Sequence, residues 1–300
     1  MTGMTRSATT SATTTPAPDA TDRKGRTAQL RDRQVEQVLD RIVEQGRPRL
    51  HQTWVELLAT AVVAGMEVAL GVLALLAVAH TTGNALLAGL AFSVGFIALL
   101  LGHSELFTEG FLVPVTVVAA REASGWQLLR FWTVTLVGNL AGGWALTWLI
   151  VLGLPELRAQ AVGLGAHFAT ASLSPQTFSL AVLAGSVITL LTRMQTGTDN
   201  DVAKIVASIA AAFLVAGLGM FHSVLDSLLI FAGIHAGGAY SYGQWAVWFG
   251  WTLLGNLLGG VGLTTLLRLV RSFHRLTEWR STTPARTDQT TIEAADGLPG

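Results

Sequence analysis

The chain of 300 residues contains no cysteine, which excludes disulfide bonds and thiolate metal sites. Charged residues are also scarce: they make up 13% of the chain, as 19 basic and 19 acidic side chains, and long stretches have none. Hydrophobic residues make up 51% of the sequence. The long uncharged stretches are apolar enough to need a hydrocarbon solvent. The composition therefore predicts an integral membrane protein. No motif indicates an enzyme, and we expect neither a cofactor nor a nucleic-acid partner.

Six segments are apolar enough to cross a bilayer as helices. They are residues 55–79, 85–120, 127–153, 177–195, 202–236 and 243–268. The second and fifth exceed the roughly 20 residues that suffice for one crossing. Both also carry polar residues in the middle, near 102–110 and 219–223. We therefore predict an all-α membrane protein with six spans, in which the second and fifth helices are broken.

A nine-residue pattern occurs twice within these segments. Its copies read Thr135-Leu-Val-Gly-Asn-Leu-Ala-Gly-Gly143 and Thr252-Leu-Leu-Gly-Asn-Leu-Leu-Gly-Gly260, and they agree at seven positions. A His-Ser pair stands at a similar distance upstream of each copy, His103-Ser104 before the first and His222-Ser223 before the second. The chain therefore reads as an internal duplication with three spans and one broken segment in each half.

Lysine and arginine are unevenly distributed among the connections between the spans. They precede the first span and recur at Arg121 and Arg130, at Arg193 and Lys204, and after the last span from Arg268 to Arg286. In contrast, residues 80–84, 154–176 and 237–242 contain only Arg158. By the positive-inside rule, both termini face the cytoplasm, in a multi-pass protein of the plasma membrane. With three spans in each half, the second half enters from the opposite side, which predicts an inverted 3+3 repeat.

The remaining segments divide the chain into four parts. Residues 1–27 have the composition of a disordered cytoplasmic tail, without the apolar core of a signal peptide. Residues 28–50 show apolar positions at helical spacing among charged ones, which predicts an amphipathic cytoplasmic helix. The six-span domain covers residues 51–271, and residues 272–300 form a polar cytoplasmic tail.

The predicted breaks point to a pore, because irregular backbone at mid-membrane depth is tolerated where it lines a cavity. The second halves of the broken helices, expected to begin near Glu109 and Ser223, would direct two positive helix ends at one place. This arrangement favours an anion. Because a bare anion in hydrocarbon is costly, a titratable group near the breaks would let the anion pass as its neutral acid.

Three motifs together resemble the formate/nitrite transporter family. They are Gly102-His-Ser-Glu-Leu-Phe-Thr108, the repeated Gly-Asn pattern, and Gly219-Met-Phe-His-Ser-Val224, and the resemblance covers about residues 50–270. It implies an aquaporin-like fold, a homopentamer with one pore in each subunit, and passage of small monovalent anions or their acids.

The resemblance also implies roles for individual residues. Glu105 to Thr108 would form the loop that breaks the second span, with Leu106 and Phe107 in a hydrophobic constriction. His222 matches the central pore histidine, next to Ser223, and Phe92 is placed at a second constriction by its spacing from Thr108. This chain departs from the family by reading Phe221-His-Ser-Val-Leu-Asp226, which loses one carboxylate and gains another, and by placing Glu109 after Thr108. Asp226 is thus a candidate pore residue or a cap of the second half-helix.

Other polar residues have structural interpretations. We expect Glu105 to brace its loop by accepting backbone N–H bonds, and we expect Asn139 and Asn256 to hold the broken segments through side-chain bonds. Tryptophans at the ends of the predicted spans are expected to form an interfacial belt. They are Trp54, Trp126, Trp245 and Trp248.

The sequence thus predicts a channel or transporter for small anions such as formate, nitrite or hydrosulfide, with passage linked to protonation at His222. Two alternatives remain open at this point. One is a pore for a small neutral solute, with His222 and Asp226 as hydrogen-bonding groups. The other is a membrane scaffold or sensor whose pore is closed and whose N-terminal helix binds a cytoplasmic partner.

Overall fold

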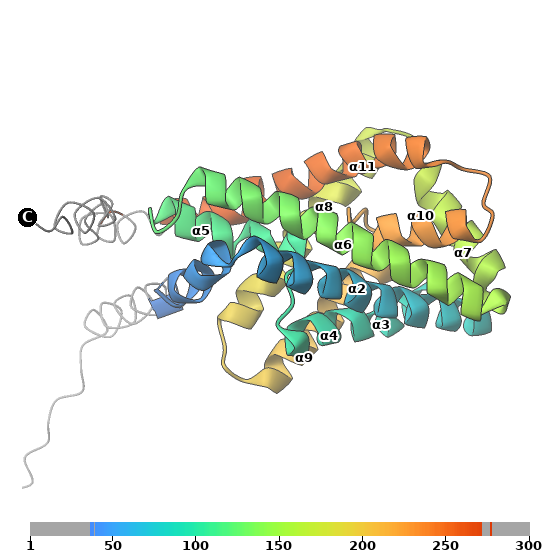
Figure 1. Cartoon of the computed structure of the whole chain (residues 1–300), viewed down its shortest axis with the longest axis horizontal. Coiled ribbons are helices and arrows are strands. Elements are labelled where there is room, and N and C mark those ends of the chain that lie inside the picture. The colour runs from blue at the N-terminus through green and yellow to red at the C-terminus, as the bar shows by residue number, and fades with distance from the viewer. Residues whose placement is uncertain (1–36, 39, 272–276, 278–300) are drawn as a thin grey trace, which may run out of the picture.

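The computed structural model describes residues 37–38, 40–271 and 277, and every regular element in this part is helical. The expected tails at 1–27 and 272–300 lie outside the described residues, apart from Thr277. The longest helices run lengthwise through the molecule (Figure 1). An N-terminal helix at 40–51 precedes α2 (Trp54–Thr82), α3 (Ala85–Ala91), α4 (Ser93–Gly102), α5 (Val113–Ala119), α6 (Gly125–Gly153), α7 (Arg158–Ala169), α8 (Pro175–Thr196), α9 (Asp201–Ala212), α10 (Leu225–His235), α11 (Tyr242–Leu257) and α12 (Leu267–Arg271).

Within these residues, five helical stretches are long and apolar enough to cross a membrane. They are Trp54–Thr82, Ala85–Gly102, Gly125–Gly153, Pro175–Thr196 and Tyr242–Leu266. The predicted fifth span, 202–236, is divided instead between α9 and α10, and the apolar segment Phe107–Ala119 is likewise short. The predicted breaks explain why neither residues 202–236 nor the segment Phe107–Ala119 forms a single helix long enough to cross the membrane.

Local sequence fixes the starts of four long helices in the same way. A Ser or Thr side chain accepts a hydrogen bond from the third helical residue, whose own side chain bonds back to the cap. The caps are Thr53 for α2, Ser124 for α6, Ser174 for α8 and Ser241 for α11. The two halves of the chain therefore begin their corresponding helices with the same device.

The first break lies where the sequence predicts it. Helix α4 ends at Gly102, and His103 follows in a left-handed conformation with a φ of 51°. A 3₁₀ turn covers Phe107–Phe111 before α5 begins at Val113, with Pro114 in its first turn. Glu109 therefore lies in the 3₁₀ turn that opens the short apolar helical segment Phe107–Ala119, and the second half-helix was expected to begin near this residue.

The second break has a different local form. A π-helical turn at Phe213–Gly217 ends α9, and Gly219 follows with a φ of 61°, where a residue with Cβ would be strained. Helix α10 then begins at Leu225, two residues after Ser223. The break at residues 218–224 therefore covers the predicted interval of 219–223.

The long helices of each half approach each other closely. A Cβ on Gly65 of α2 would collide with the backbone of Asn139 on α6, and a Cβ on Gly185 of α8 would collide with the backbone of Asn256 on α11. Glycine at these positions lets the backbones touch, as small residues do in membrane helix pairs. The duplicated motif therefore corresponds to a duplicated helix contact.

Residues 154–176, predicted to be a connection between spans, contain helix α7. This helix packs on α10: a Cβ on Gly165 would meet the carbonyl of Leu229 at 2.8 Å, and the hydroxyl of Tyr240 donates to the Val162 carbonyl at 3.1 Å. The N-terminal helix at 40–51 packs on α5 in a similar way, with Gly46 against the side chains of Val113 and Val117. Each half therefore carries one extra helix against its short half-helix.

The first and last described helices lie at the same end of the molecule (Figure 1). We call this the terminal end; it carries the 40–51 helix, α5 and α12. The other end carries α7 and the start of α11, and we call it the opposite end.

Candidate functional site

The two helix breaks meet inside the protein. Oγ1 of Thr108, in the first break, lies 3.0 Å from Nε2 of His222, in the second, although 114 residues separate them in sequence. The side chains are 0% and 1% exposed. The structure therefore brings together two residues that the sequence assigns to one pore.

The hydrogen bonds of His222 define which ring nitrogen carries the proton. The backbone N–H of Leu225 donates to Nδ1 at 3.0 Å, so Nδ1 acts as an acceptor and holds no proton. In a neutral imidazole the proton is then on Nε2, and Nε2–H donates to the Thr108 hydroxyl. The hydroxyl proton of Thr108 remains available for a third group.

Asp226 lies one helical turn after His222 and is 1% exposed. Its Oδ2 accepts the backbone N–H of His222 at 2.7 Å, which gives a partner to a buried donor in the break before α10. Ser223 contributes its carbonyl to the hydroxyl of Ser227 at 2.5 Å. In this arrangement, Asp226 holds the backbone of the break that carries His222.

Asn139 holds the first break to its neighbours. Its Oδ1 accepts the N–H of Phe107 at 2.8 Å, and its Nδ2 donates to the carbonyls of Ala61 at 2.8 Å and Glu105 at 3.0 Å. The amide is fully buried, so each of these bonds avoids the cost of a buried polar group without a partner.

Asn256 repeats this arrangement in the second half. Its Oδ1 accepts the N–H of Ser223 at 2.8 Å, and its Nδ2 donates to the carbonyls of Ala181 and Phe221, both at 2.8 Å. Matching the bonds of the two asparagines aligns Phe107 with Ser223, and therefore Leu106 with His222. The His-Ser pairs that look equivalent in sequence are not equivalent in space, since His103 is an exposed residue at the end of α4.

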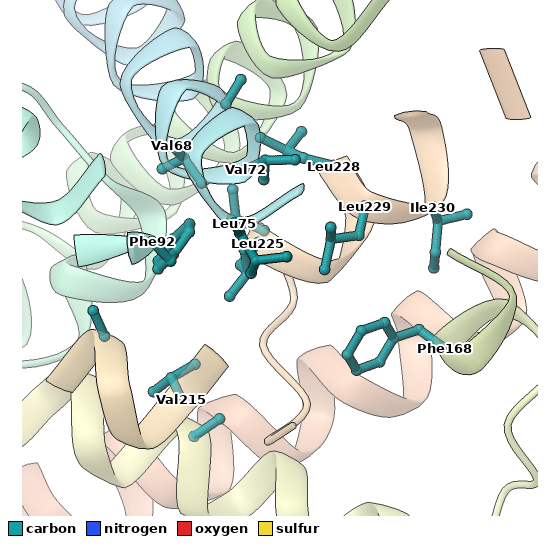
Figure 2. Packing of buried hydrophobic residues seen from close by; sticks show 14 of the residues in the cluster. Val68, Val72, Leu75, Phe92, Phe168, Val215, Leu225, Leu228, Leu229 and Ile230 are labelled. Carbon is teal, nitrogen blue, oxygen red and sulfur yellow. The ribbon is translucent and has the colours of Figure 1, made fainter. Parts of the chain in front are cut away.

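The candidate constriction residues are buried. Leu106 is 0% and Phe107 3% exposed, and the Phe107 ring packs edge-on against Phe111, with centroids 5.1 Å apart. Phe92 lies at the junction of α3 and α4, with its ring 5.0 Å from that of Phe96. Figure 2 shows Phe92 in the apolar interior close to Leu75 and Leu225.

Beside the first break, Glu105 forms a buried ion pair with Arg49. The guanidinium donates to both carboxylate oxygens and stacks on the Phe131 ring at 5.6 Å, and the side chains are 22% and 5% exposed. Burial has the largest single effect on the pKa of Arg49 and lowers it, but the charge of Glu105, the hydrogen bonds to Glu105 and the charge of Glu109 together raise the pKa above its ordinary value. The expectation that Glu105 accepts backbone N–H bonds is wrong, because Arg49 occupies its carboxylate.

An aromatic cluster takes the corresponding place beside the second break. Phe168 of α7 lies 5.3 Å from Phe221 and 6.0 Å from Trp248, and the Phe221 and Trp248 rings are 6.1 Å apart. Figure 2 shows Phe168 approaching α10 from a different side than Phe92 does. Trp248 is 2% exposed, whereas Trp54 and Trp126 are 57% and 67% exposed, so the expectation that Trp248 belongs to an interfacial belt is wrong.

Arg49 and the aromatic cluster were not predicted from the sequence, although the repeat could have marked part of the cluster. Phe131 and Trp248 both stand eight residues before the repeated asparagine. Aligning the two motifs would therefore have marked Trp248 as an interior position. Among the described residues, no group of His, Asp or Glu could hold a metal ion.

Comparison with known proteins adds a family match. The sequence model described as "Formate/nitrite transporter" matches residues 36–270. The chain is 27% identical over 243 residues to the inner membrane protein YfdC of Escherichia coli (strain K12), covering 76% of each chain.

Two solved structures share the fold. One, described as "FNT family ion channel", aligns with a TM-score of 0.68 at 21% identity, over 78% of this chain and 98% of the other. Another, described as "Pentameric formate channel with formate bound", aligns with a TM-score of 0.60 at 21% identity, over 75% and 97%. The predicted all-helical membrane fold is therefore confirmed.

Proposed function

The chain belongs to the formate/nitrite transporter family, and on that premise we propose that it is a membrane channel for small monovalent anions or their weak acids. Formate is the first candidate, because a structural relative is described as a formate channel with formate bound. Nitrite and hydrosulfide are the next. The observation that carries the proposal is the buried contact between Thr108 and His222, at the meeting point of two helix breaks.

His222 and Thr108 form a donor pair for an anion. The imidazole N–H polarises the threonine hydroxyl, whose own proton can point to an oxygen of the substrate. Leu106 and Phe107 supply the apolar constriction next to this pair, and Phe92 supplies another. An anion crosses such apolar rings far more easily as its neutral acid.

Full proton transfer sets a further condition on His222. With Leu225 N–H bonded to Nδ1, the ring carries one proton, and giving it away would leave an imidazolate. A proton from the aqueous solution must therefore bind Nδ1 as the Leu225 bond opens. The imidazolium then gives its Nε2 proton to Thr108 Oγ1, the Thr108 hydroxyl proton passes to the anion, and the ring is left neutral with its proton on Nδ1. Asp226 keeps the backbone of the break in place during this exchange.

The proposed assembly is a homopentamer in the plasma membrane, with both termini in the cytoplasm. The pentamer is supported by the solved relative described as a pentameric formate channel, and the location by the relative named as an inner membrane protein. The terminal end would then be cytoplasmic.

The test is the flux of formate, nitrite and hydrosulfide into proteoliposomes across a pH series. We expect native protein to carry at least one of these anions, with faster flux as the pH falls. His222→Ala should lose the pH-dependent part, while the control His80→Ala, at an exposed position at the end of α2, should keep it.

A native protein that carries none of the three anions would contradict the proposal. Flux that is independent of pH and of membrane voltage would favour the pore for a neutral solute. Assembly of each variant is checked by gel filtration before its flux is compared.

A further inference from the structure

The second half of the molecule has polar groups where the first half has apolar or satisfied ones. Trp248 occupies the position of Phe131, eight residues before the repeated asparagine, and so adds an indole N–H. Ser223 takes the place of Phe107 next to the asparagine amide and adds a hydroxyl. The repeats therefore differ in chemistry at two positions with the same backbone contacts.

A third difference concerns a threonine present in both halves. Thr135 donates its hydroxyl to the carbonyl of Phe131 at 2.7 Å, one turn earlier in α6. The hydroxyl of Thr252, its counterpart in α11, has no hydrogen-bond partner within the described part of the chain. The usual bond of a buried helical threonine to its own helix is thus missing at Thr252.

All three of these groups in the second half are buried and unsatisfied. Nε1 of Trp248, Oγ1 of Thr252 and Oγ of Ser223 lack a partner among the described residues, and their side chains are 2%, 0% and 0% exposed. Leaving a buried donor unpaired costs free energy, and native proteins seldom do so without a reason. Two of these groups lie on α11 and the third lies at the break that Asn256 of α11 holds, and each needs a partner that the described part of the chain does not supply.

These groups follow one face of α11 towards the break. Trp248, Thr252 and Asn256 are spaced four residues apart, so each lies about 6 Å further along the helix than the last. Asn256 bonds directly to Ser223, which follows His222.

A cavity at the opposite end of the molecule reaches the Trp248 side chain, while its indole N–H stays buried. Its volume is about 410 Å³, and Trp248 lines it together with Gln244 of α11, the cap residue Ser241 and the end of α7. Formate has three heavy atoms, so the cavity is larger than the proposed substrate needs. Trp248 thus stands between an open cavity and the buried hydroxyls.

We propose that Trp248, Thr252 and Ser223 form a second binding site for a small anion, between this cavity and His222. An indole N–H can only donate, and the two hydroxyls are free to donate, so the occupant must present hydrogen-bond acceptors. Entry requires the Phe221 and Trp248 rings to separate, since the donors are closed off in this state. The identification of the anion as formate rests on the proposed function, whereas the existence of the site does not depend on it.

The experiment measures anion-dependent thermal stabilisation of the full-length protein in detergent. Sodium formate, nitrite, acetate and hydrosulfide are each titrated against sodium gluconate at constant ionic strength. We compare native protein with Trp248→Phe and Thr252→Val, which remove one donor each and keep the shape. Thr135→Val is the matched control, because it removes the counterpart hydroxyl, which is already bonded within its helix.

We expect the concentration for half-maximal stabilisation to rise about three- to tenfold in Trp248→Phe and in Thr252→Val, and to stay unchanged in Thr135→Val. If Trp248→Phe does not fold, Thr252→Val alone decides the outcome, since replacing an unpaired hydroxyl by a methyl group costs little. An unchanged midpoint in both site variants would overturn the site, even if native protein carries formate.

The two proposals can fail separately. If another of the anions stabilises the native protein and the site variants weaken that effect, the site stands while formate is excluded. If none of the four anions stabilises the native protein, the site is overturned, whatever the flux assay shows.

Discussion

At the scale of single residues, the hydrogen bonds of His222 decide what the site can do. Because Leu225 N–H holds Nδ1 as an acceptor, the ring presents its one proton to Thr108. The Thr108 hydroxyl accepts a hydrogen bond from Nε2–H, which gives the buried ring a hydrogen-bond partner and polarises the hydroxyl as a donor to the substrate. A valine at this position would have nearly the same shape and neither property.

Thr108→Val should accordingly lower both stability and flux. The buried Nε2–H would lose its partner, which costs about 1–3 kcal/mol, and anion flux should fall at least about tenfold. Thermal unfolding in detergent and proteoliposome flux measure the two effects. The control is Thr147→Val, whose equally buried hydroxyl bonds only within its own helix. Unchanged flux in Thr108→Val would show that the substrate does not use this hydroxyl.

At the scale of elements, each helix break is held from one side by an extra helix. The 40–51 helix holds the first break through the ion pair of Arg49 with Glu105, on the face of Phe131. Helix α7 holds the second break through Phe168, which packs on Phe221 and Trp248. An ion pair at the terminal end thus corresponds to an aromatic cluster at the opposite end.

The ion pair of Arg49 with Glu105 allows a prediction about stability. Arg49→Met should destabilise the protein by roughly 3–5 kcal/mol, because Glu105 would keep a buried charge without its partner. The double variant Arg49→Met with Glu105→Leu should recover much of that loss. Denaturation by sodium dodecyl sulfate measures each variant, and Asp201→Asn, at a pair in which Asp201 is 75% exposed, should change stability little. If the stability change of the double variant equals the sum of the changes in the single variants, the two residues are not coupled.

At the scale of the whole molecule, the distribution of charge and the course of the chain agree. The 40–51 helix and α12 lie at one end, and the connection between α8 and α9 meets the same helix through Arg41 and Asp199. Arg41, Arg47 and Arg49, which precede the first span, thus belong to the end that also carries α5. A membrane around the long helices would separate this end from α7.

The absence of cysteine makes this orientation testable with single substitutions. Val202→Cys is exposed at the start of α9, and Leu173→Cys is exposed between α7 and α8. In intact cells, a membrane-impermeant maleimide should label Leu173→Cys directly and Val202→Cys only after the membrane is permeabilised. The reverse pattern would place the termini outside the cytoplasm.

Much of the fold follows from patterns that are local in the sequence. Apolar runs longer than a bilayer crossing predict the membrane helices, and polar residues within two of them predict the breaks at 102–110 and 219–223. The repeated motif also predicts that Asn139 and Asn256 bond to the broken segments, which is what their hydrogen bonds do. Hydrophobicity, caps and breaker residues act over a few turns, so one can infer them without knowing which helices are neighbours.

What the tertiary structure decided are the pairings between distant positions. Arg49 meets Glu105 across 56 residues, and Thr108 meets His222 across 114. Trp248 lies at a predicted span end in sequence but is buried, because α7 packs Phe168 against it. Such contacts depend on which helix faces fit together, and packing selects them only when all the helices are in place.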